Sequence, residues 1–302
     1  MKREEDIYLS ICVPTYNRAD LLERLINSIP VEQVGVELVI VDDGSTDHTG
    51  RMVMEYKKCV GYPIVYQWHE NYGRAKSLHD SIILASGMYT IIMDSDDWFV
   101  DGGVSIILSF LKEYMPATNI GKRMVEAVVF GARLISGIEK CDNYPPITER
   151  TNFIAIKADY GVDKDLKEVV CTDIIKKCLY SIDQGCRRVP TYLIWAKVAE
   201  DYDCLCVRKI VACKEYLPGG MTDRILLHKT RDARPMVELY ASVSGSTMYN
   251  SRYYRWKCRL LWGRYAFHAG ILDVSNLWQV LILPFAWMIY IYDRYQLRQF
   301  KS

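Results

Sequence analysis

The sequence predicts an α/β fold, a doubly wound and mainly parallel sheet with helices on both faces. Two observations support this class. Short apolar runs alternate with segments of helical periodicity over the first hundred residues, and each apolar run ends in a polar cluster. Half of the 302 residues are hydrophobic and a quarter are charged. This balance is typical of a globular protein and excludes a disordered chain.

Four short apolar runs are expected to form buried strands. They are Ile7–Val13, Val36–Val41, Pro63–Trp68 and Met88–Met93. Segments of helical spacing lie between them, over Leu21–Ile29, Thr46–Lys58 and Arg74–Ser86. Asp20 and Glu23 suggest a capping box for the first helix, and Gly87 suggests the C-cap of the third. Repeated units of this kind form parallel sheets, which bind ligands beyond the carboxyl ends of their strands.

Beyond residue 100 the pattern is weaker. The expected elements are a helix over Ile106–Tyr114, a strand over Ala127–Ile135, a loop-rich stretch over 136–165, helices near 166–182 and 192–202, and a strand over Cys204–Ala212. Ten cysteines include no Cys-x-x-Cys pair, so buried thiols in a reducing cytosol are expected. The charged N-terminus is not a signal peptide, and a net charge of +1 argues against a nucleic-acid partner.

Residues 226–302 differ in character and are expected to form a helical extension. Between Glu238 and Asp273 there is no acidic residue, and basic side chains are interleaved with aromatic ones. The apolar run Leu277–Tyr292 would make a helix of about 24 Å, shorter than the ~30 Å hydrocarbon core of a bilayer. These features favour peripheral attachment of a cytoplasmic protein to the inner face of the plasma membrane. The alternative is a soluble subdomain whose aromatic side chains pack on the main domain.

The segment Asp94-Ser95-Asp96-Asp97 follows the fourth expected strand. Three carboxylates within four residues repel one another unless a cation or hydrogen-bond donors balance their charge. Mg²⁺ or Mn²⁺ on a diphosphate fits one or two protein carboxylates, so a hard divalent cation is the expected ligand. The alternative is a solvated turn.

Polar clusters also follow the other three expected strands. Asp42-Asp43-Gly44-Ser45 offers carboxylates to a base N–H or to ribose hydroxyl groups, with a simple capping turn as the alternative. Pro14-Thr15-Tyr16-Asn17-Arg18 presents backbone groups and an aromatic face suited to a nucleobase. Asn71-Tyr72-Gly73-Arg74 precedes a helix, where Arg74 can meet phosphate beside the helix N-terminus.

In this order and spacing, the four segments resemble the family 2 glycosyltransferases with the GT-A fold. The resemblance is carried by Ser10–Arg18, Val41–Asp47, Asn71–Arg74 and Asp94–Trp98, and it covers about residues 7–100. Further on, a weaker acceptor-half pattern resembles members that build bacterial surface polysaccharide. It consists of Arg188-Val-Pro190, Trp195 and Tyr216–Thr222.

The resemblance implies an inverting enzyme that uses a nucleotide-sugar donor, with a UDP-sugar expected, and Mn²⁺ or Mg²⁺. Pro14, Tyr16 and Asp43 would hold the nucleoside. Asp94 would lie near the ribose and diphosphate. The other expected donor-binding residues are Thr15, Arg18, Asp42, Asn71, Arg74 and Ser95.

The resemblance implies Asp96 as the metal ligand and Asp97 as a support for the metal shell or the donor sugar. His228, late in the chain, is a candidate metal ligand or donor-phosphate contact, with a structural role as the alternative. Inverting transfer also needs a base for the acceptor hydroxyl. Related members commonly carry an acidic residue where this chain has Thr191, which cannot act as a base at neutral pH. The alternatives are a weakened enzyme or another carboxylate, from Glu200, Asp201, Asp203, Asp173 and Asp183.

We therefore expect a glycosyltransferase domain over residues 1–225, with a donor half at 1–100 and an acceptor half at 101–225, and an extension at 226–302. The expected acceptor is a lipid-linked or growing glycan of the cell surface. One alternative is a sugar nucleotidyltransferase, although that class normally has a Gly-rich basic loop where this chain has Pro14–Arg18. The other is a non-catalytic nucleotide-sugar-binding or scaffold protein, which Thr191 supports.

Overall fold

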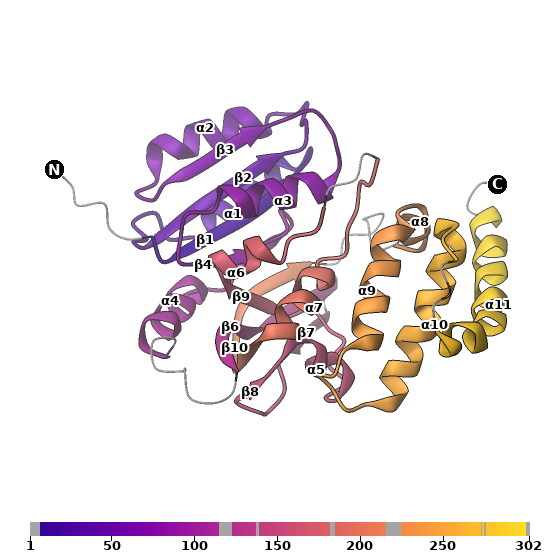
Figure 1. The fold of residues 1–302 in the computed structure, drawn as a ribbon. Helices are drawn as coiled ribbons and strands as arrows, with labels where there is room; N and C mark the ends of the chain where they lie inside the picture. Colours follow the sequence, from indigo (N-terminus) through magenta and orange to yellow (C-terminus); the bar gives the residue numbers. More distant parts are fainter. Residues whose placement is uncertain are drawn as a thin grey trace.

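The computed structural model describes residues 7–114, 123–136, 139–181, 185–215, 225–272, 274 and 276–299. Within these residues a ten-stranded mixed sheet forms the centre, in the order β3-β2-β1-β4-β9-β6-β10-β5, with β7 beside β6 and β8 beside β10 (Figure 1). The strands are β1 (Leu9–Thr15), β2 (Val36–Asp42), β3 (Ile64–Trp68), β4 (Tyr89–Ile92), β5 (Asp97–Phe99), β6 (Met124–Ser136), β7 (Glu139–Asn143), β8 (Arg150–Thr151), β9 (Lys167–Cys171) and β10 (Tyr202–Glu215).

The strands and helices of the first hundred residues match their expected positions to within three residues. Strands β1 to β4 run parallel, and every side chain of β1 and β2 is buried. The helices between them are α1 (Ala19–Asn27), α2 (Thr49–Cys59) and α3 (Arg74–Leu84). The predicted doubly wound α/β class is confirmed, because α1, α2 and α4 (Gly103–Tyr114) pack on one side of the sheet and α3 packs on the other.

Both predicted helix caps are wrong, because contacts distant in sequence replace them. Helix α1 begins at Ala19 without a side-chain cap of its own, and Asp47 from the next loop accepts the Ala19 N–H at 3.3 Å. Helix α3 has Ala85 as its C-cap. Gly87 instead lies against β1, where a Cβ atom would fall 2.8 Å from Ser10 Oγ.

The second half differs from the prediction in two places. The stretch 136–165 contains β7, β8 and α5 (Phe153–Ala158), and the segment near 166–182 begins with strand β9 before α6 (Thr172–Lys177). Strand β9 lies antiparallel between β4 and β6, where Val169 and Val170 are fully buried. Such a short apolar run has no helical or strand periodicity of its own, so its place in the sheet decides its conformation.

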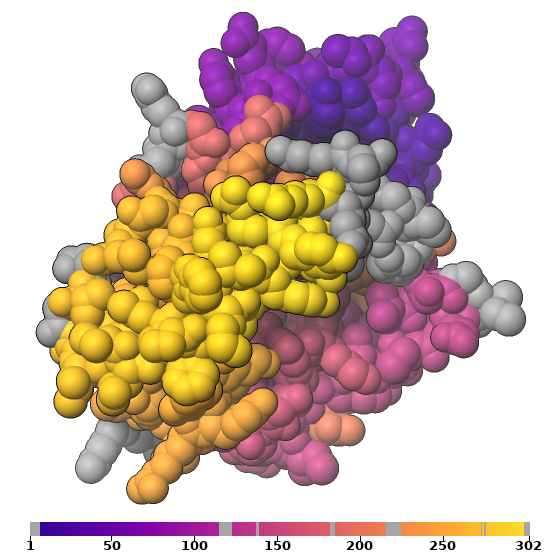
Figure 2. Space-filling view, turned by 90° about the vertical axis from the view of Figure 1, so that its right-hand side faces the viewer, coloured from indigo at the N-terminus to yellow at the C-terminus, as the bar shows by residue number. Residues whose placement is uncertain are grey.

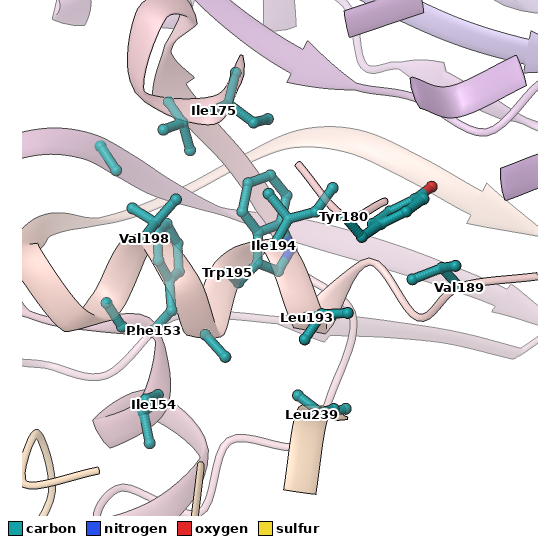
Figure 3. Packing of buried hydrophobic residues seen from close by; sticks show 14 of the residues in the cluster. Phe153, Ile154, Ile175, Tyr180, Val189, Leu193, Ile194, Trp195, Val198 and Leu239 are labelled. Carbon is teal, nitrogen blue, oxygen red and sulfur yellow. The ribbon is translucent and has the colours of Figure 1, made fainter. Parts of the chain in front are cut away.

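Helix α7 (Tyr192–Asp201) packs at the centre of the second hydrophobic core. Its Trp195 ring lies 5.3 Å from the ring of Phe153 in α5, with Ile175 above them and Tyr180 to one side (Figure 3). The same core includes Met236 and Leu239 from the C-terminal helices. Helices α5, α6 and α7 therefore share one packed interior with the C-terminal helices.

Four helices end the described chain and lie side by side beyond α7 (Figure 1). They are α8 (Ile225–Arg231), α9 (Ala233–Gly245), α10 (Arg252–Ala269) and α11 (Leu277–Gln299). Helix α11 is outermost, and with 23 residues it is about 34 Å long, which exceeds the predicted length because it continues past Tyr292. Among the described helices, none is both long enough and apolar enough to cross a bilayer.

Candidate active site

The polar clusters predicted from the sequence meet at one edge of the sheet. Strands β1, β2 and β4 are parallel, and β9 is antiparallel to both β4 and β6. Because β6 and β10 are parallel to each other, β10 ends at the same edge. Thr15, Asp42 and Asp94 therefore lie along this carboxyl edge, joined by Lys214 near the end of β10 and by Lys167 at the start of β9.

Asp94 is paired with the first residue of α3. Arg74 Nε and Nη2 donate to Asp94 Oδ1 at 3.1 and 2.5 Å. Burial disfavours a charged Asp94, yet Arg74 and, at longer range, Lys214 hold the pKa of this carboxyl well below its usual range. Asp94 is therefore ionised at neutral pH and surrounded by positive charge, which suits a site for ribose and phosphate.

Asp96 lies two residues further, on the rim of the edge. Arg18 Nη1 donates to Asp96 Oδ2 at 2.7 Å, and the carboxylate keeps 19% of its surface exposed. Arg24 holds the backbone of this loop, because its Nη2 donates to the Asp96 carbonyl at 2.9 Å while its guanidinium stacks 3.8 Å from the Trp98 ring centre. Ser95, between the two acidic residues, is buried.

Asp97 takes a different position from the one expected of a metal ligand. It is the first residue of β5 and is 1% exposed, and Lys167 Nζ donates to its Oδ2 at 2.5 Å. Burial raises the pKa of Asp97, with Lys167 opposing the rise and Asp94 adding to it. The buried Asp97–Lys167 pair joins β5 to β9 and leaves Asp97 away from the rim.

Asp42 and Asp43 shape the neighbouring loops. Asp42 accepts hydrogen bonds from Ser45 N at 2.8 Å and from the Tyr66 hydroxyl at 2.7 Å. Asp43 Oδ1 accepts the backbone N–H groups of Tyr72 and Gly73 at 2.8 and 2.9 Å. Burial raises the pKa of Asp43, although the two N–H groups oppose the rise. Both carboxylates are thus held by the protein, and Asp43 fixes the loop that leads into α3.

Two exposed aromatic rings lie in the loops that follow β1 and β3. Tyr16 is 46% exposed and Tyr72 is 56% exposed, whereas Pro14 and Thr15 are buried at the end of β1. The loop after β1 passes through Asn17, whose positive φ of 48° brings its Oδ1 within 2.8 Å of the Thr46 N–H. Among the described residues, Thr15 Oγ1 is buried without a hydrogen-bond partner.

The segment after residue 185 crosses onto the carboxyl edge. Arg187 contacts Asn71, and its carbonyl accepts the Ala75 N–H at 3.1 Å. Gly73 has a φ of 100°, and a Cβ there would fall 2.7 Å from the Arg187 backbone, so only glycine allows this crossing. Burial lowers the pKa of Arg188, as does the nearby charge of Arg74. This segment therefore adds the positive charges of Arg187 and Arg188 to the site.

Beside this segment the structure has a cavity of about 390 Å³. It is lined by Gly185, Cys186, Arg231, Asp232, Ala233, Arg234, Pro235, His268 and Ala269. Asp232 is 4% exposed and accepts Arg231 Nη2 at 3.0 Å. The charges of Asp232 and Asp94 both act on Arg188, so this arginine lies near the cavity and near the carboxyl edge.

The proposed bases do not gather at the carboxyl edge. Thr191 lies at the start of α7, whereas Glu200 and Asp201 lie at its other end, about 14 Å along the axis. Asp203 begins β10 at the amino edge of the sheet, where Arg123 and Arg150 hold it at 2.8 Å each.

The two remaining candidates do not change this result. Asp173 follows β9 at the amino edge, and Asp183 lies outside the described residues. Glu200 and Asp201 share a helix with Thr191 but are far from it along the helix axis. The hypothesis that one of them supplies the base in place of Thr191 therefore does not fit the structure.

The late elements of the sequence pattern are only partly described. His228 is half-buried in α8, and Tyr216–Thr222 lie outside the described residues. No group of three or more His, Cys, Asp and Glu side chains that could hold a metal ion occurs in the described part of the chain. A cation at Asp96 would therefore need ligands from a bound molecule.

The sequence pattern found Arg18 and Arg74 but missed three other basic residues of the site. Lys167 and Lys214 come from strands β9 and β10, and Arg187 comes from a loop. Lys167 could have been placed in the site only by recognising β9 as a strand, because this strand starts at the carboxyl edge. Asp232 had no local signal, since its position depends on how α9 packs against α7.

Comparison with known proteins agrees with this geometry. Residues 10–155 match the family model described as Glycosyl transferase family 2. The abequosyltransferase RfbV of Salmonella typhimurium is 35% identical over 107 residues, which cover 34% of this chain and 32% of that protein. The chain thus spans about a third of the length of this relative.

Solved structures establish the fold. S. aureus TarS 1–349 in complex with UDP-GlcNAc superposes with a TM-score of 0.61 and 15% identity, covering 95% of this chain and 81% of that one. The mannosyltransferase PcManGT from Pyrobaculum calidifontis, solved with GDP-Man and Mn²⁺, gives 0.52 and 15% with the same coverage. The fold is that of the GT-A glycosyltransferases, and residues 10–155 match glycosyl transferase family 2.

Proposed function

We propose that this protein is an inverting glycosyltransferase that moves a sugar from a nucleotide-sugar donor, with a UDP-sugar expected, to a glycan or lipid-linked acceptor of the bacterial surface. The observation that carries the proposal is the placement of Asp94 and Asp96 against Arg74 and Arg18 at the carboxyl edge. In both ion pairs, a donor diphosphate can take a place beside the arginine and its cation can take a place beside the carboxylate. No buried charge is then left without a partner.

The nucleoside belongs beside the ends of β1 and β2. The exposed rings of Tyr16 and Tyr72 offer faces on which a base can stack. The role proposed for Asp43 is to hold the Asn71–Arg74 loop for the donor, since its carboxylate already accepts the N–H groups of that loop. The Thr15 hydroxyl, buried and unpartnered among the described residues, is a further polar group at this end of β1.

Mn²⁺ or Mg²⁺ is the proposed cofactor, and the chemistry of the donor set supports it. Asp96 offers hard carboxylate oxygens at the rim, and a hard cation takes one or two such ligands when diphosphate oxygens supply others. The cation would stabilise the negative charge of the departing diphosphate. Arg74 and Lys214 would share that charge, while Asp97 stays paired with Lys167.

The acceptor is placed in the cavity beside Arg231 and Asp232. The cavity of about 390 Å³ supports this placement, and Asp232 is the carboxylate that lines it. We propose Asp232 as the base that takes the proton of the acceptor hydroxyl, after Arg231 swings away from it. Substitution Asp232→Asn should lower kcat at least 100-fold and leave UDP affinity unchanged. Equal losses of kcat and UDP affinity would contradict this role.

The experiment that tests the function measures release of nucleoside diphosphate from a panel of nucleotide sugars. The panel contains UDP-GlcNAc, UDP-glucose, GDP-mannose and dTDP-rhamnose, with Mn²⁺ and bacterial lipid extract as the acceptor source. Wild type is compared with Asp96→Ala and with Asp101→Ala, whose exposed side chain follows β5, the last strand in the order of the sheet. We expect turnover by wild type and by Asp101→Ala, and a loss of about 1,000-fold in Asp96→Ala.

Two results would contradict the proposal. The first is full activity in Asp96→Ala, which would remove the metal assignment. The second is a folded wild-type protein that turns over none of these donors, which would favour the scaffold alternative that Thr191 supports.

A further inference from the structure

Helix α11 turns its apolar side chains away from the protein. Leu277, Leu281 and Met288 are 75%, 65% and 63% exposed. Large apolar residues continue along the same exposed side, which also includes Val280, Phe285, Trp287, Ile291, Tyr292 and Tyr295. Figure 2 shows this helix across the near face of the C-terminal helices. A continuous exposed apolar face of this length indicates a surface that binds something.

The inward side of α11 is held by specific contacts. Asp293 is buried, where Arg264 donates to it through two bonds of 2.6 Å and His268 Nε2 lies 2.9 Å away. Gly263 of α10 lets the helices approach, since a Cβ there would fall 2.7 Å from the Cβ of Ala286. The helix therefore cannot rotate to bury its apolar side without breaking this ion cluster.

Helix α10 extends the apolar surface and adds an aromatic rim. Trp256 is half exposed and meets Phe285 edge-on, with ring centres 6.2 Å apart. Tyr253, one turn earlier, is 80% exposed. Amphipathic aromatic rings of this kind prefer the boundary between water and an apolar phase.

The charges around this surface have one sign. In the sequence of α10 and α11 the single carboxylate is Asp293, which is buried, whereas there are seven arginines and lysines. Arg252, Lys257, Arg294 and Arg298 are exposed. A surface that combines apolar area with unopposed positive charge complements anionic lipid headgroups.

We propose that the outward side of α11, together with Tyr253 and Trp256, lies in the headgroup region of an anionic bilayer, with α11 parallel to the membrane plane. The inference rests on the proposed function for its setting, a transferase that works beside a membrane. A second copy of this chain fits the surface less well, because a symmetric contact would bring the same cations together. The exposed side of α11 would enter the bilayer by about 5–10 Å.

The test is co-sedimentation of the full chain with vesicles of phosphatidylcholine and phosphatidylglycerol in a 7:3 ratio. The variant Leu277→Gln/Leu281→Gln/Met288→Gln removes outward apolar groups that lie outside the ion cluster. The matched control Val34→Gln/Met54→Gln/Ile147→Gln alters three exposed apolar residues elsewhere. We expect wild type and control to bind, the α11 variant to partition at least tenfold less, and pure phosphatidylcholine to bind wild type at least tenfold less.

The proposal is overturned if wild type stays in the supernatant, or if the α11 variant binds like wild type. It is also overturned if lipid-free wild type is a dimer that the α11 variant converts to monomers, because the occupant is then a second copy. Titration of UDP with Mn²⁺ is run on the same samples. Lost nucleotide binding with intact vesicle binding would refute the proposed function alone, and the reverse would refute only the membrane surface.

Discussion

The carboxyl edge of the sheet and helix α11 place polar and apolar groups in opposite ways. At the edge, Asp94 and Asp96 are each met by an arginine, so charge is concentrated where a ligand would bind and balanced while no ligand is there. On α11 the buried side holds Asp293 and Gln279, and the outer side is apolar. The contrast teaches that the same rule governs both regions. A polar side chain is buried where the fold supplies fixed partners for it. The chemistry of the exposed surface then indicates what kind of ligand binds there.

The largest expected effect separates carboxylates that hold the fold from those that serve a ligand. Asp97→Ala should lower the free energy of unfolding by about 3–5 kcal/mol, because it leaves the buried Lys167 ammonium unpaired. Asp96→Ala should lower it by about 1 kcal/mol or less, because that pair is partly exposed. Urea unfolding followed by circular dichroism measures both values. Equal effects would remove the distinction between the two residues.

The ion cluster under α11 is expected to be the next most sensitive feature. Asp293→Asn leaves Arg264 and His268 without their carboxylate and should destabilise the attachment of α11 by about 3 kcal/mol. Hydrogen exchange of the α11 amides measures this as faster exchange. Asp163→Asn is the matched control, because its carboxylate pairs with Lys157 while 74% exposed. Unchanged exchange in Asp293→Asn would show that packing alone holds the helix.

The crossing of the acceptor half over the edge depends on Gly73. Gly73→Ala should cost about 1–3 kcal/mol, because it combines a φ of 100° with a clash against the Arg187 backbone, and it should weaken nucleotide binding. Gly161→Ala isolates the backbone effect, since Gly161 has a φ of 67° and open space around it. Calorimetry and urea unfolding compare the two. If the Gly73→Ala protein is no less stable than Gly161→Ala, the Arg187 backbone moves away from the added methyl group at little cost in stability.

The remaining effect depends on pH and comes from Glu168 of β9. Burial raises the pKa of Glu168 to about 7, with Lys167 and Lys157 opposing the rise, whereas an unfolded glutamate titrates near 4.3. The protonated form is favoured in the folded state, so this contribution to stability is complete below about pH 4 and is lost as pH rises through about 7. Glu168→Gln should therefore gain about 3 kcal/mol over wild type at pH 8 and nothing at pH 4. Urea midpoints that differ equally at both pH values would contradict this.

The first half of the fold was predictable because its signals are local. Each strand from β1 to β4 is an apolar run that ends in polar residues, and parallel strands bring those ends to one edge. The placement of Asp94 and Asp96 at this edge follows from chain direction alone. Their arginine partners could be inferred only in part, since Arg74 lies next to a recognised motif whereas the Arg18–Asp96 contact joins loops 78 residues apart.

The conformation of β9 and the orientation of α11 depend on packing between residues distant in sequence, which local sequence patterns do not indicate. Strand β9 carries only two fully buried valines beside Lys167 and Glu168, so its neighbours decide that it is a strand. The run in α11 was recognised as an apolar helix, but its polar residues Gln279 and Asp293 give no sign that they point inward. That orientation comes from Arg264 and His268 on α10, which are distant in sequence.

The most direct test of the central claim is calorimetric titration of UDP into the full chain with and without Mn²⁺. The account predicts binding to wild type that weakens at least tenfold without Mn²⁺, and at least tenfold in Asp96→Ala, while Asp101→Ala binds like wild type. Preference for GDP or dTDP in the same assay would keep the site and change the donor. UDP binding that is indifferent to both Mn²⁺ and Asp96 would contradict the assignment of the carboxyl edge as the donor site.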